Sequence, residues 1–549
     1  MGARGGSQGV KLETFFEKFD QFADAPDAVA KMRELILESA IRGMLVPHNA
    51  SDEPASELLK RMARVQAGQV LKQAALPPVG DDAYLQVPPG WAWTRLGNTG
   101  RIFNGDSVSE SGKAELAKVE DGLPFIATKD VGYGRAALVY DNGLKVPLRD
   151  PRFKVARANA VLICAEGGSA GRKIGITDRD ICFGNKLYAN EVSAGIHHRY
   201  IFYVYQAPTF FREFAARMTG IIGGIARSEF RSLPIPLPPE KEQKRIVAKV
   251  DELMALCDRL EAQQQERETR HAALARASLA RFADAPTPAN LPFLFHPSYA
   301  IPPADLRKSI LTLAVQGKLV PQDPNDEPAE RGLGDCGVDL KRWAVAKEEE
   351  RQDVPSSWTW IRFAGVGEQR LGKMLDAQKN KGESKSYLRN TNVQWMRFEL
   401  DDVKEMRVEE REEEELRLKH GDLLICEGGE PGRCAIWRDD VPEMYFQKAL
   451  HRVRPCDAIL SEFLALNLQI DCRNEVLAGY FTGATIKHLT GRSLSAYPIP
   501  IPPLAEQRRI VAKVEQLMAL VDALDTQLAA SRATAANLLS ALVAELTAA

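Results

Sequence analysis

The stretch that decides the fold is PIPLPPEKEQKRIVAKVDELMALCDRL, residues 234–260, because the chain contains it twice. It returns at residues 498–524 as PIPIPPLAEQRRIVAKVEQLMALVDAL, with 19 of the 27 residues identical. In both copies a proline run, which is extended rather than helical, leads into a sequence of helical period. The offset of 264 residues is far longer than the roughly 20 to 50 residues of a short-period repeat. The chain therefore contains two large related modules.

Three further landmarks recur in the same order. Each keeps a motif: Asp-Glu-Pro-Ala, a Trp-x-Trp pair, and an Ile-Cys strand followed by glycines and an arginine. The paired ranges are 36–55 with 310–329, 87–95 with 354–362, and 163–172 with 425–433, which is one residue shorter. This alignment pairs Arg172 with Arg433. Between the landmarks, at roughly 97–160 and 364–421, the copies share little sequence, so one scaffold carries two different inserts.

The helix that follows each proline run is long. Apolar residues at i, i+3, i+4 and i+7 predict amphipathic helices over residues 240–282 and 504–546. At 1.5 Å per residue each helix is on the order of 60 Å long, and two such helices in one chain most simply pair as a coiled coil. The residues that we expect to pair the helices or to bind a partner are Ile246, Val250, Leu253, Leu256, Leu260, Ile510, Val514, Leu517, Leu520 and Leu524.

The predicted fold class is α+β, with two pseudo-symmetric α/β domains joined by two long antiparallel helices that form a coiled coil. Residues 161–164 and 173–176 have the pattern of short buried strands, and residues 198–218 that of an amphipathic helix broken near Pro208. The expected segments are a flexible leader 1–30, a helical segment 31–85, domain 86–239, the first long helix 240–283, a proline-rich connector with a second helical segment 284–350, domain 351–502, and the second long helix 503–549.

Composition narrows the function. The 549 residues are 45% hydrophobic and carry a net charge of −2, which excludes a disordered chain and a polycation that coats nucleic acid. No apolar run is long enough to span a bilayer, and the N-terminus lacks the apolar core of a signal peptide. The eight cysteines form no CxxC pair and are expected to be buried thiols of a cytoplasmic protein.

Sequence motifs of catalysis are missing. There is no GxxxxGK[ST] phosphate cradle, no dinucleotide-binding GxGxxG between a strand and a helix, and no HExxH metal motif. The Asn/Asp-Pro-Pro-Tyr/Phe element of amino-methyltransferases is also missing. Glu166 and Glu427 lie beside glycine turns in both copies; they are turn residues or, alternatively, catalytic carboxylates. We predict no catalytic residue and no metal site.

Local charge favours nucleic acid. Residues 85–235 contain 20 basic and 14 acidic residues, a net charge of +6. Residues 350–497 have a net charge of −3, which becomes +4 without the acidic block 399–415, a run that is a solvated face or repels DNA. Basic domains of this kind suit a duplex reader, in which phosphate contacts position the protein and base contacts specify the sequence. The candidate DNA-binding residues are Lys129, Tyr133, Arg135, Arg172, Lys173, Lys186, Arg227, Arg231, Lys373, Arg389, Arg433, Lys448, Lys487 and Arg492.

The architecture resembles the specificity subunit of type I restriction–modification systems, on the helix-entry motif P-I-P-[LI]-P-P-x-x-E-Q-x-R-I-V-A-K-V and on QGKLVPQDPNDEPA at 316–329. The resemblance implies that each α/β domain is a target recognition domain that reads half of a bipartite site in double-stranded DNA. It also implies that the helices set the distance between the halves and dock two modification subunits, which use S-adenosylmethionine to methylate adenine N6. A restriction subunit that needs ATP and Mg²⁺ can join. The chain itself would be non-catalytic, without a cofactor and without a membrane partner.

Two other functions fit the residues. The first is a coiled-coil scaffold whose two inserts bind peptides or proteins. The second is a stand-alone endonuclease with a cryptic metal site. The basic domains disfavour the scaffold, and the missing motifs disfavour the endonuclease.

Overall fold

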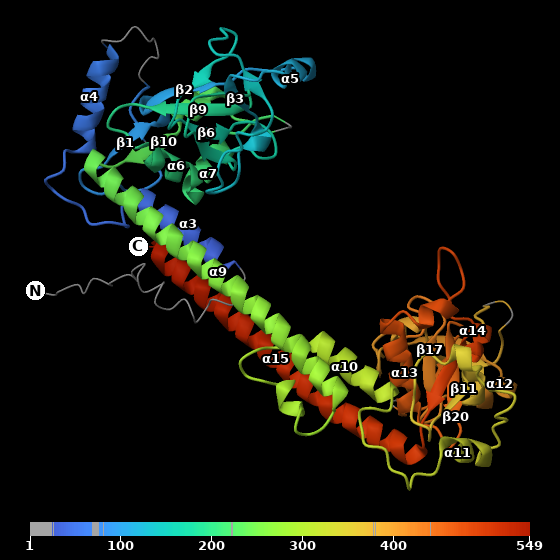
Figure 1. Cartoon of the computed structure of the whole chain (residues 1–549). Coiled ribbons are helices and arrows are strands. Elements are labelled where there is room, and N and C mark those ends of the chain that lie inside the picture. The colour runs from blue at the N-terminus through green and yellow to red at the C-terminus, as the bar shows by residue number, and fades with distance from the viewer. Residues whose placement is uncertain are drawn as a thin grey trace, which may run out of the picture. The chain divides into compact units, whose positions relative to one another are not determined.

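The computed structural model describes residues 25, 27–67, 76–80, 82–220, 223–376, 378, 380–439 and 441–548 (Figure 1). They form two compact units: unit 1 is Met1–Glu266 with Ser531–Ala549, and unit 2 is Arg267–Ala530. The predicted leader lies largely outside the described residues, and its proposed end at residue 30 is too late because helix α3 begins at Ala28. Each unit thus contains one predicted domain, the start of one long helix and the end of the other.

Unit 1 begins with a helical segment and continues into a mixed domain. Its helices are α3 (Ala28–Ile41), α4 (Ala55–Ala67), α5 (Glu110–Leu116), α6 (His198–Gln206), α7 (Pro208–Ala216), α8 (Arg227–Ser232) and the first part of α9 (Glu240–Asp284). Its strands are β1 (Ala92–Arg95), β2 (Gly100–Asn104), β3 (Leu123–Ile126), β4 (Lys145–Val146), β5 (Val155–Ala156), β6 (Val161–Cys164), β7 (Ile174–Ile176), β8 (Ile181–Phe183), β9 (Leu187–Val192) and β10 (Pro234–Leu237). The predicted break at Pro208 is confirmed, because the proline begins α7.

Unit 2 repeats this order in outline, with differences inside the insert. Its helices are α10 (Pro303–Val315), α11 (Ala329–Asp335), α12 (Glu410–Leu416), α13 (Ser461–Arg473), α14 (Gly491–Ala496) and most of α15 (Leu504–Ala548). Its strands are β11 (Thr359–Arg362), β12 (Gly367–Leu371), β13 (Glu383–Leu388), β14 (Val393–Gln394), β15 (Arg397–Phe398), β16 (Lys404–Val408), β17 (Leu423–Cys426), β18 (Cys434–Ile436), β19 (Tyr445–Phe446), β20 (Leu450–Pro455) and β21 (Pro498–Ile501).

The two inserts share the strand order of their main sheet although their sequences differ. The main sheet has the order β2-β9-β6-β7 in unit 1 and β12-β20-β17-β18 in unit 2, with every pair antiparallel. A second sheet pairs β3 with β8, and β13 with β19, in parallel. The central strands β6 and β17 are buried along their whole length, because their apolar residues lie between the helices and the second sheet.

Each proline run forms a strand that closes its insert. β10 pairs with β1 and β21 with β11, and the last partners are Arg95 with Pro234 and Arg362 with Pro498. Proline is tolerated because each pair is a separate two-stranded sheet in which alternate N–H groups need no partner. The chain therefore enters and leaves each insert at neighbouring positions. We call residues 96–233 cassette 1 and residues 363–497 cassette 2.

The repeated landmarks meet in one joint at the start of each long helix. In unit 1, the indole Nε1–H of Trp91 donates to Glu242 at 2.9 Å, and Arg245 pairs with Asp52 at 2.7 Å. Gln243 accepts from the backbone N–H of His197 at 2.8 Å. The joint brings together three of the four landmarks, so its packing explains why those sequences recur.

Unit 2 contains the same joint with the same geometry. Trp358 donates to Glu506 at 3.0 Å, and Arg509 pairs with Asp326 at 2.6 Å. Gln507 accepts from the backbone N–H of Leu460 at 2.8 Å. The Glu and Gln side chains of both joints are at most 1% exposed. Buried polar groups that are all hydrogen-bonded fix one arrangement of the chain, so each insert is held on its helix in the same way.

The apolar stripes of the long helices pack first on their own unit. Ile246, Val250 and Leu253 are buried in a cluster that contains α3, and Ile510, Val514 and Leu517 in one that contains α10, as Figure 1 shows for α3 along α9. Leu256, Leu260 and Leu524 are partly buried. Leu520 is 43% exposed, so its predicted burial between helices is wrong; the register turns it outward. Its partner-binding role stays a prediction.

The same clusters contain the far end of the other long helix. Ala535 and Leu539 of α15 belong to the core of unit 1, and Ala275 and Phe282 of α9 to that of unit 2. Because each unit holds the start of one long helix and the end of the other, the two helices run antiparallel, as predicted. Among the helices of the described residues, none is both long and apolar enough to cross a membrane.

Candidate nucleic-acid interface

Three loops lie side by side at one edge of each cassette. In cassette 1, the N–H of Ala165 donates to the carbonyl of Lys186 at 2.8 Å, and the N–H of Ile225 to that of Ala165 at 3.0 Å. We call this surface the loop edge; it comprises residues 165–168, 184–186, 219–220 and 223–228 in unit 1, and 427–430, 447–449 and 482–492 in unit 2.

The loop edge of cassette 2 is built by equivalent bonds. The N–H of Glu427 donates to the carbonyl of Ala449 at 2.9 Å, and the N–H of Leu489 to that of Glu427 at 2.7 Å. Glu166 forms a bridge to Gly224 in unit 1, so both glutamates that followed the Ile-Cys strands belong to turns of this edge. No group of three His, Cys, Asp or Glu side chains that could hold a metal occurs among the described residues.

Five of the predicted DNA-binding residues lie on the loop edge and carry charges that form no ion pair with a described residue. Each has an exposed side chain and forms no ion pair with another described residue. They are Lys186 and Arg227 in unit 1, and Lys448, Lys487 and Arg492 in unit 2. Unpaired cations on hydrogen-bonded turns suit phosphate groups, which need positive charge held at fixed positions.

Arg231, four residues after Arg227 on α8, adds a partly buried cation beside this edge in unit 1. Nε and one Nη of its guanidinium are buried without a hydrogen-bond partner among the described atoms. Burial lowers its pKa, and the positive charge of Arg227 lowers it further. An anion beside the two arginines would relieve both effects, so this pair is the strongest electrostatic signal for a phosphate in unit 1.

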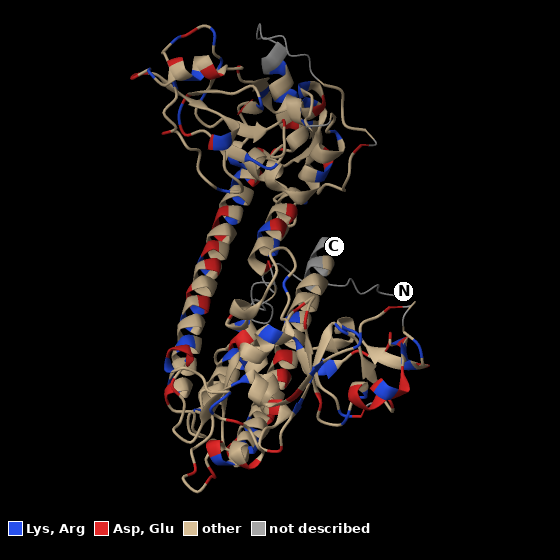
Figure 2. Cartoon of the chain, turned by 90° about the vertical axis from the view of Figure 1, so that its right-hand side faces the viewer, with Lys and Arg blue, Asp and Glu red and all other residues tan. Residues whose placement is uncertain are grey.

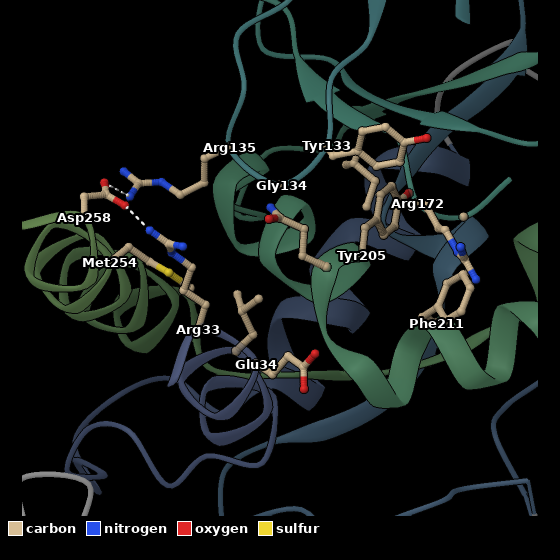
Figure 3. A pocket seen from close by; sticks show the side chains of 14 residues that line it. Arg33, Glu34, Tyr133, Gly134, Arg135, Arg172, Tyr205, Phe211, Met254 and Asp258 are labelled. Carbon is tan, nitrogen blue, oxygen red and sulfur yellow. Dashed lines mark hydrogen bonds and ion pairs between the residues drawn. The ribbon is translucent and has the colours of Figure 1, made fainter. Parts of the chain in front are cut away.

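Other predicted residues of cassette 1 line a cavity of about 580 Å³ between the cassette, α3 and α9 (Figure 3). Arg135 and Arg33 reach Asp258 of α9 from two sides, at 3.0 and 2.9 Å. The guanidinium of Arg172 lies 5.3 Å from the ring centre of Phe211. The Arg135–Asp258 pair fastens the cassette to α9 and neutralises Arg135, whereas Arg172 is exposed, packs on Phe211 of α7 inside the cassette, and stays a candidate.

The remaining predicted residues of cassette 1 have mixed positions. Tyr133 is 58% exposed, and its hydroxyl lies 3.2 Å from that of Ser169. Lys173 donates to the carbonyl of Thr128 at 3.1 Å, so its side chain connects two turns of the cassette. Lys129 is exposed and stays a candidate.

Two predicted residues of cassette 2 form ion pairs within the domain. Lys373 is only 8% exposed and pairs with Glu409 at 2.6 Å and with Glu412. Arg389 pairs with Asp402 at 2.8 Å. The acidic block 399–415 therefore neutralises cations of its own domain, and Figure 2 shows acidic and basic residues interleaved in unit 2. Lys373 and Arg389 stay predicted phosphate contacts, but each would have to leave an ion pair to bind DNA.

Arg433 occupies a different structural position from the one that the sequence alignment gave it. Strand pairing sets Ile425 opposite Cys434, and Ile163 opposite Ile174, so Arg433 corresponds to Lys173 and not to Arg172. Its guanidinium donates to the carbonyl of Asn390 at 2.9 Å and pairs with Glu430 at 3.0 Å. Like Lys173, Arg433 therefore connects neighbouring turns of its cassette. Between the paired strand residues the turn is two residues shorter in unit 2, whereas the sequence alignment allowed for only one.

A buried histidine beneath the loop edge of unit 2 makes stability depend on pH. His451 is 3% exposed and lies 2.8 Å from the carbonyl of Leu489; burial lowers its pKa below the usual 6.5, an effect that Glu427 partly offsets. The unfolded chain takes up this proton first as pH falls. We therefore expect unit 2 to be equally stable above about pH 7 and to lose up to about 1.4 kcal/mol per pH unit below about 6.5.

Hydrogen exchange of unit 2 between pH 5 and 8 measures this loss. The His451→Gln variant keeps an amide donor but cannot titrate, so its profile should be flatter. An equal pH dependence in both proteins would assign the loss to other groups, among which His197 and His198 of unit 1 also have pKa values lowered by burial.

Sequence reasoning missed the hairpins at residues 219–224 and 482–488, which complete the loop edges. Their signal was the Thr-Gly pair at 219–220 and 482–483, a short repeat at nearly the offset of the longer ones. Two similar cassettes with cationic loop edges, each clamped to a long helix, define the chain as a duplicated recognition protein.

Comparison with known protein families shows the family to which the chain belongs. The type I restriction modification DNA specificity domain matches residues 88–268 and again 355–530. The chain belongs to this family. It is the specificity subunit of a type I restriction–modification system, with two specificity domains.

Known relatives are similar over nearly the whole chain. The EcoAI specificity subunit of Escherichia coli is 28% identical, over 94% of this chain and 93% of the relative. The EcoEI specificity subunit of Escherichia coli is 27% identical over the same shares. The HsdS subunit of Thermoanaerobacter tengcongensis, a crystal structure, is 17% identical, covers 84% of this chain and 98% of that one, and has a TM-score of 0.44.

Proposed function

We propose that each cassette reads one half of a bipartite site in double-stranded DNA through its loop edge. The observation that carries the proposal is that one backbone scaffold appears twice with different side chains. Arg227 and Arg231 supply charge in unit 1, whereas Lys448, Lys487 and Arg492 supply it in unit 2. A scaffold that is kept while its exposed residues differ suits two readers of different sequences, each positioned by phosphate contacts.

The two joints would dock two identical modification subunits. The repeated surface around them supports this proposal: Arg33 and Arg307 hold equivalent carboxylates of α9 and α15, Asp258 and Asp522, at 2.9 and 2.8 Å. Lys249 and Lys513 are likewise equivalent. Each donates a hydrogen bond to the side chain three residues later in its helix, Glu252 or Gln516. Two copies of one surface in one chain can bind two copies of one partner.

The chemistry would belong to those partners. We propose that the modification subunits bind S-adenosylmethionine and methylate adenine N6, and that a restriction subunit, which needs ATP and Mg²⁺, joins them. A base must leave the stack to be methylated, so the specificity subunit would hold the duplex and leave the target adenine to its partner. Such a complex would act on DNA in the cytoplasm.

Methylation mapping tests the proposal. We expect methylated adenines at one bipartite motif in cells that carry this gene with its partner genes, and none at that motif when this gene alone is deleted. Restoring the gene should restore the pattern. A methylation pattern that is independent of the gene would refute the proposed role.

A further inference from the structure

A short hairpin closes each loop edge. In unit 2, Thr482 and His488 exchange two backbone hydrogen bonds, of 2.8 and 2.9 Å. In unit 1, Thr219 and Gly224 exchange the same pair, at 2.8 and 3.1 Å. The hairpin is therefore part of both cassettes, although the loop of unit 2 is one residue longer.

The hairpin of unit 2 is held firmly at its base. Gly483 has a φ of +93°, and a Cβ there would lie 2.2 Å from the carbonyl oxygen of Ile486, so only glycine fits the turn. A Cβ on Gly428 would lie 3.0 Å from Nδ1 of His488, which shows that the hairpin packs against the turn after β17. Leu489 then bonds to Glu427 and anchors the outgoing strand.

The tip of this hairpin presents an apolar side chain to solvent. Ile486 is 67% exposed, more than any other large apolar residue in the described part of the chain. Lys487 follows it and is exposed, and Lys448 on the neighbouring loop and Arg492 at the start of α14 are exposed cations too. An isoleucine alone on a surface needs no explanation, but one fixed on a tight turn among unpaired cations has the composition of a DNA-groove contact.

We propose that the hairpin 482–488 enters a groove of the DNA half-site read by cassette 2. Ile486 makes an apolar contact with base edges, and Lys487 binds a phosphate beside it. The charge of the surrounding loops selects DNA over a protein surface, and insertion of apolar side chains between groove walls is an established means of reading sequence. This inference rests on the proposed function, because it names a specificity-determining residue of the same loop edge.

Two variants separate the two roles. Ile486→Ala should lower affinity for the mapped site about tenfold, the scale of one mismatched base pair, and leave affinity for unrelated DNA unchanged. Its methylation motif should become degenerate at one or two positions of one half. Lys487→Ala should weaken both kinds of DNA alike and make the slope of log K against log salt shallower by about one. Both are measured on the full chain with its modification subunits.

Leu148→Ala is the matched control, since Leu148 is a 60% exposed apolar residue outside the loop edge. It should change neither affinity nor motif. An unaltered motif and affinity ratio in Ile486→Ala would overturn the inference, and so would a loss of folding, because a tip residue supports no core. Failure of the wild-type complex to prefer its mapped site would instead count against the proposed function.

Discussion

A chain in which cassette 1 also replaces cassette 2 should recognise one half-site twice. Residues 96–233 would stand in place of residues 363–497, so the half-site of cassette 2 should disappear from the methylation motif and that of cassette 1 should appear in both halves. Several base pairs change together, and each mismatch costs about 1–3 kcal/mol. The preference for the original bipartite site should therefore fall by about a thousandfold or more. Methylation mapping and competition binding measure the change.

The replacement should fold because the cassette ends and their supports are equivalent. Arg95 lies opposite Pro234, and Arg362 opposite Pro498, so both junctions are closed by the same strand pair. In its own unit Arg135 pairs with Asp258. In the transplanted cassette it would lie near Asp522, the equivalent residue of α15. The prediction thus depends on the closing strand pair that both units contain and on an ion pair that the exchange would newly form.

A second exchange supplies the control. Cassette 1 replaced by that of a relative should change one half of the motif and leave the half read by cassette 2 intact. If either exchange alters both halves, recognition is not modular. If the duplicated chain still prefers the original motif, sequence is read outside the cassettes.

Helices and repeats could be predicted from the sequence because their signals are local. The first long helix was expected to end at residue 282 and ends at Asp284, and the proline runs were expected to be extended. The role of those runs was not predictable, because a strand is defined by its partner. Pro234 and Arg95 are 139 residues apart in sequence, and nothing near either one indicates the other.

The topology of the inserts was hidden for the same reason. Strands β6 and β17 were visible as apolar runs, but the parallel pairing of β3 with β8 joins residues about 57 apart. Tertiary packing keeps this arrangement with many different side chains, so two cassettes can match in structure without matching in sequence.

The sequence shows which residue types could contact DNA, but not which of those side chains are already paired within the fold. Lys373 and Lys448 look alike in the sequence, yet the first is enclosed by Glu409 and Glu412 and the second is exposed. The acidic block that supplies these partners was interpreted as a solvated face, because ion pairs across 36 or more residues leave no local pattern. Availability is therefore decided by the fold, and the loop edge emerged only from backbone bonds between distant turns.

The largest effect on stability is expected from Trp358→Ala in the joint of unit 2. Trp358 is 6% exposed, stacks edge-on against Phe463 with ring centres 5.7 Å apart, and donates to Glu506 at 3.0 Å. Truncation of a buried tryptophan costs about 3–5 kcal/mol through the cavity it leaves. It also removes a donor from a carboxylate whose pKa burial already raises. Hydrogen exchange of residues 504–521 should report the loss, and recognition of the second half-site should weaken with it.

Trp358→Phe separates the two contributions, because phenylalanine fills most of the space but cannot donate to Glu506. We expect it to cost about 1–3 kcal/mol, the penalty for a buried acceptor that loses a partner. The raised pKa of Glu506 should rise further without the indole donor, so the variant should lose more stability as pH increases from about 4.5 toward neutrality. Trp91→Phe should carry a similar stability cost in unit 1, since Trp91 donates to Glu242 at 2.9 Å. If Trp358→Ala and its counterpart Trp91→Ala both unfold as the wild type does, the joints do not hold the cassettes on the helices, and the modular geometry must come from elsewhere in each unit.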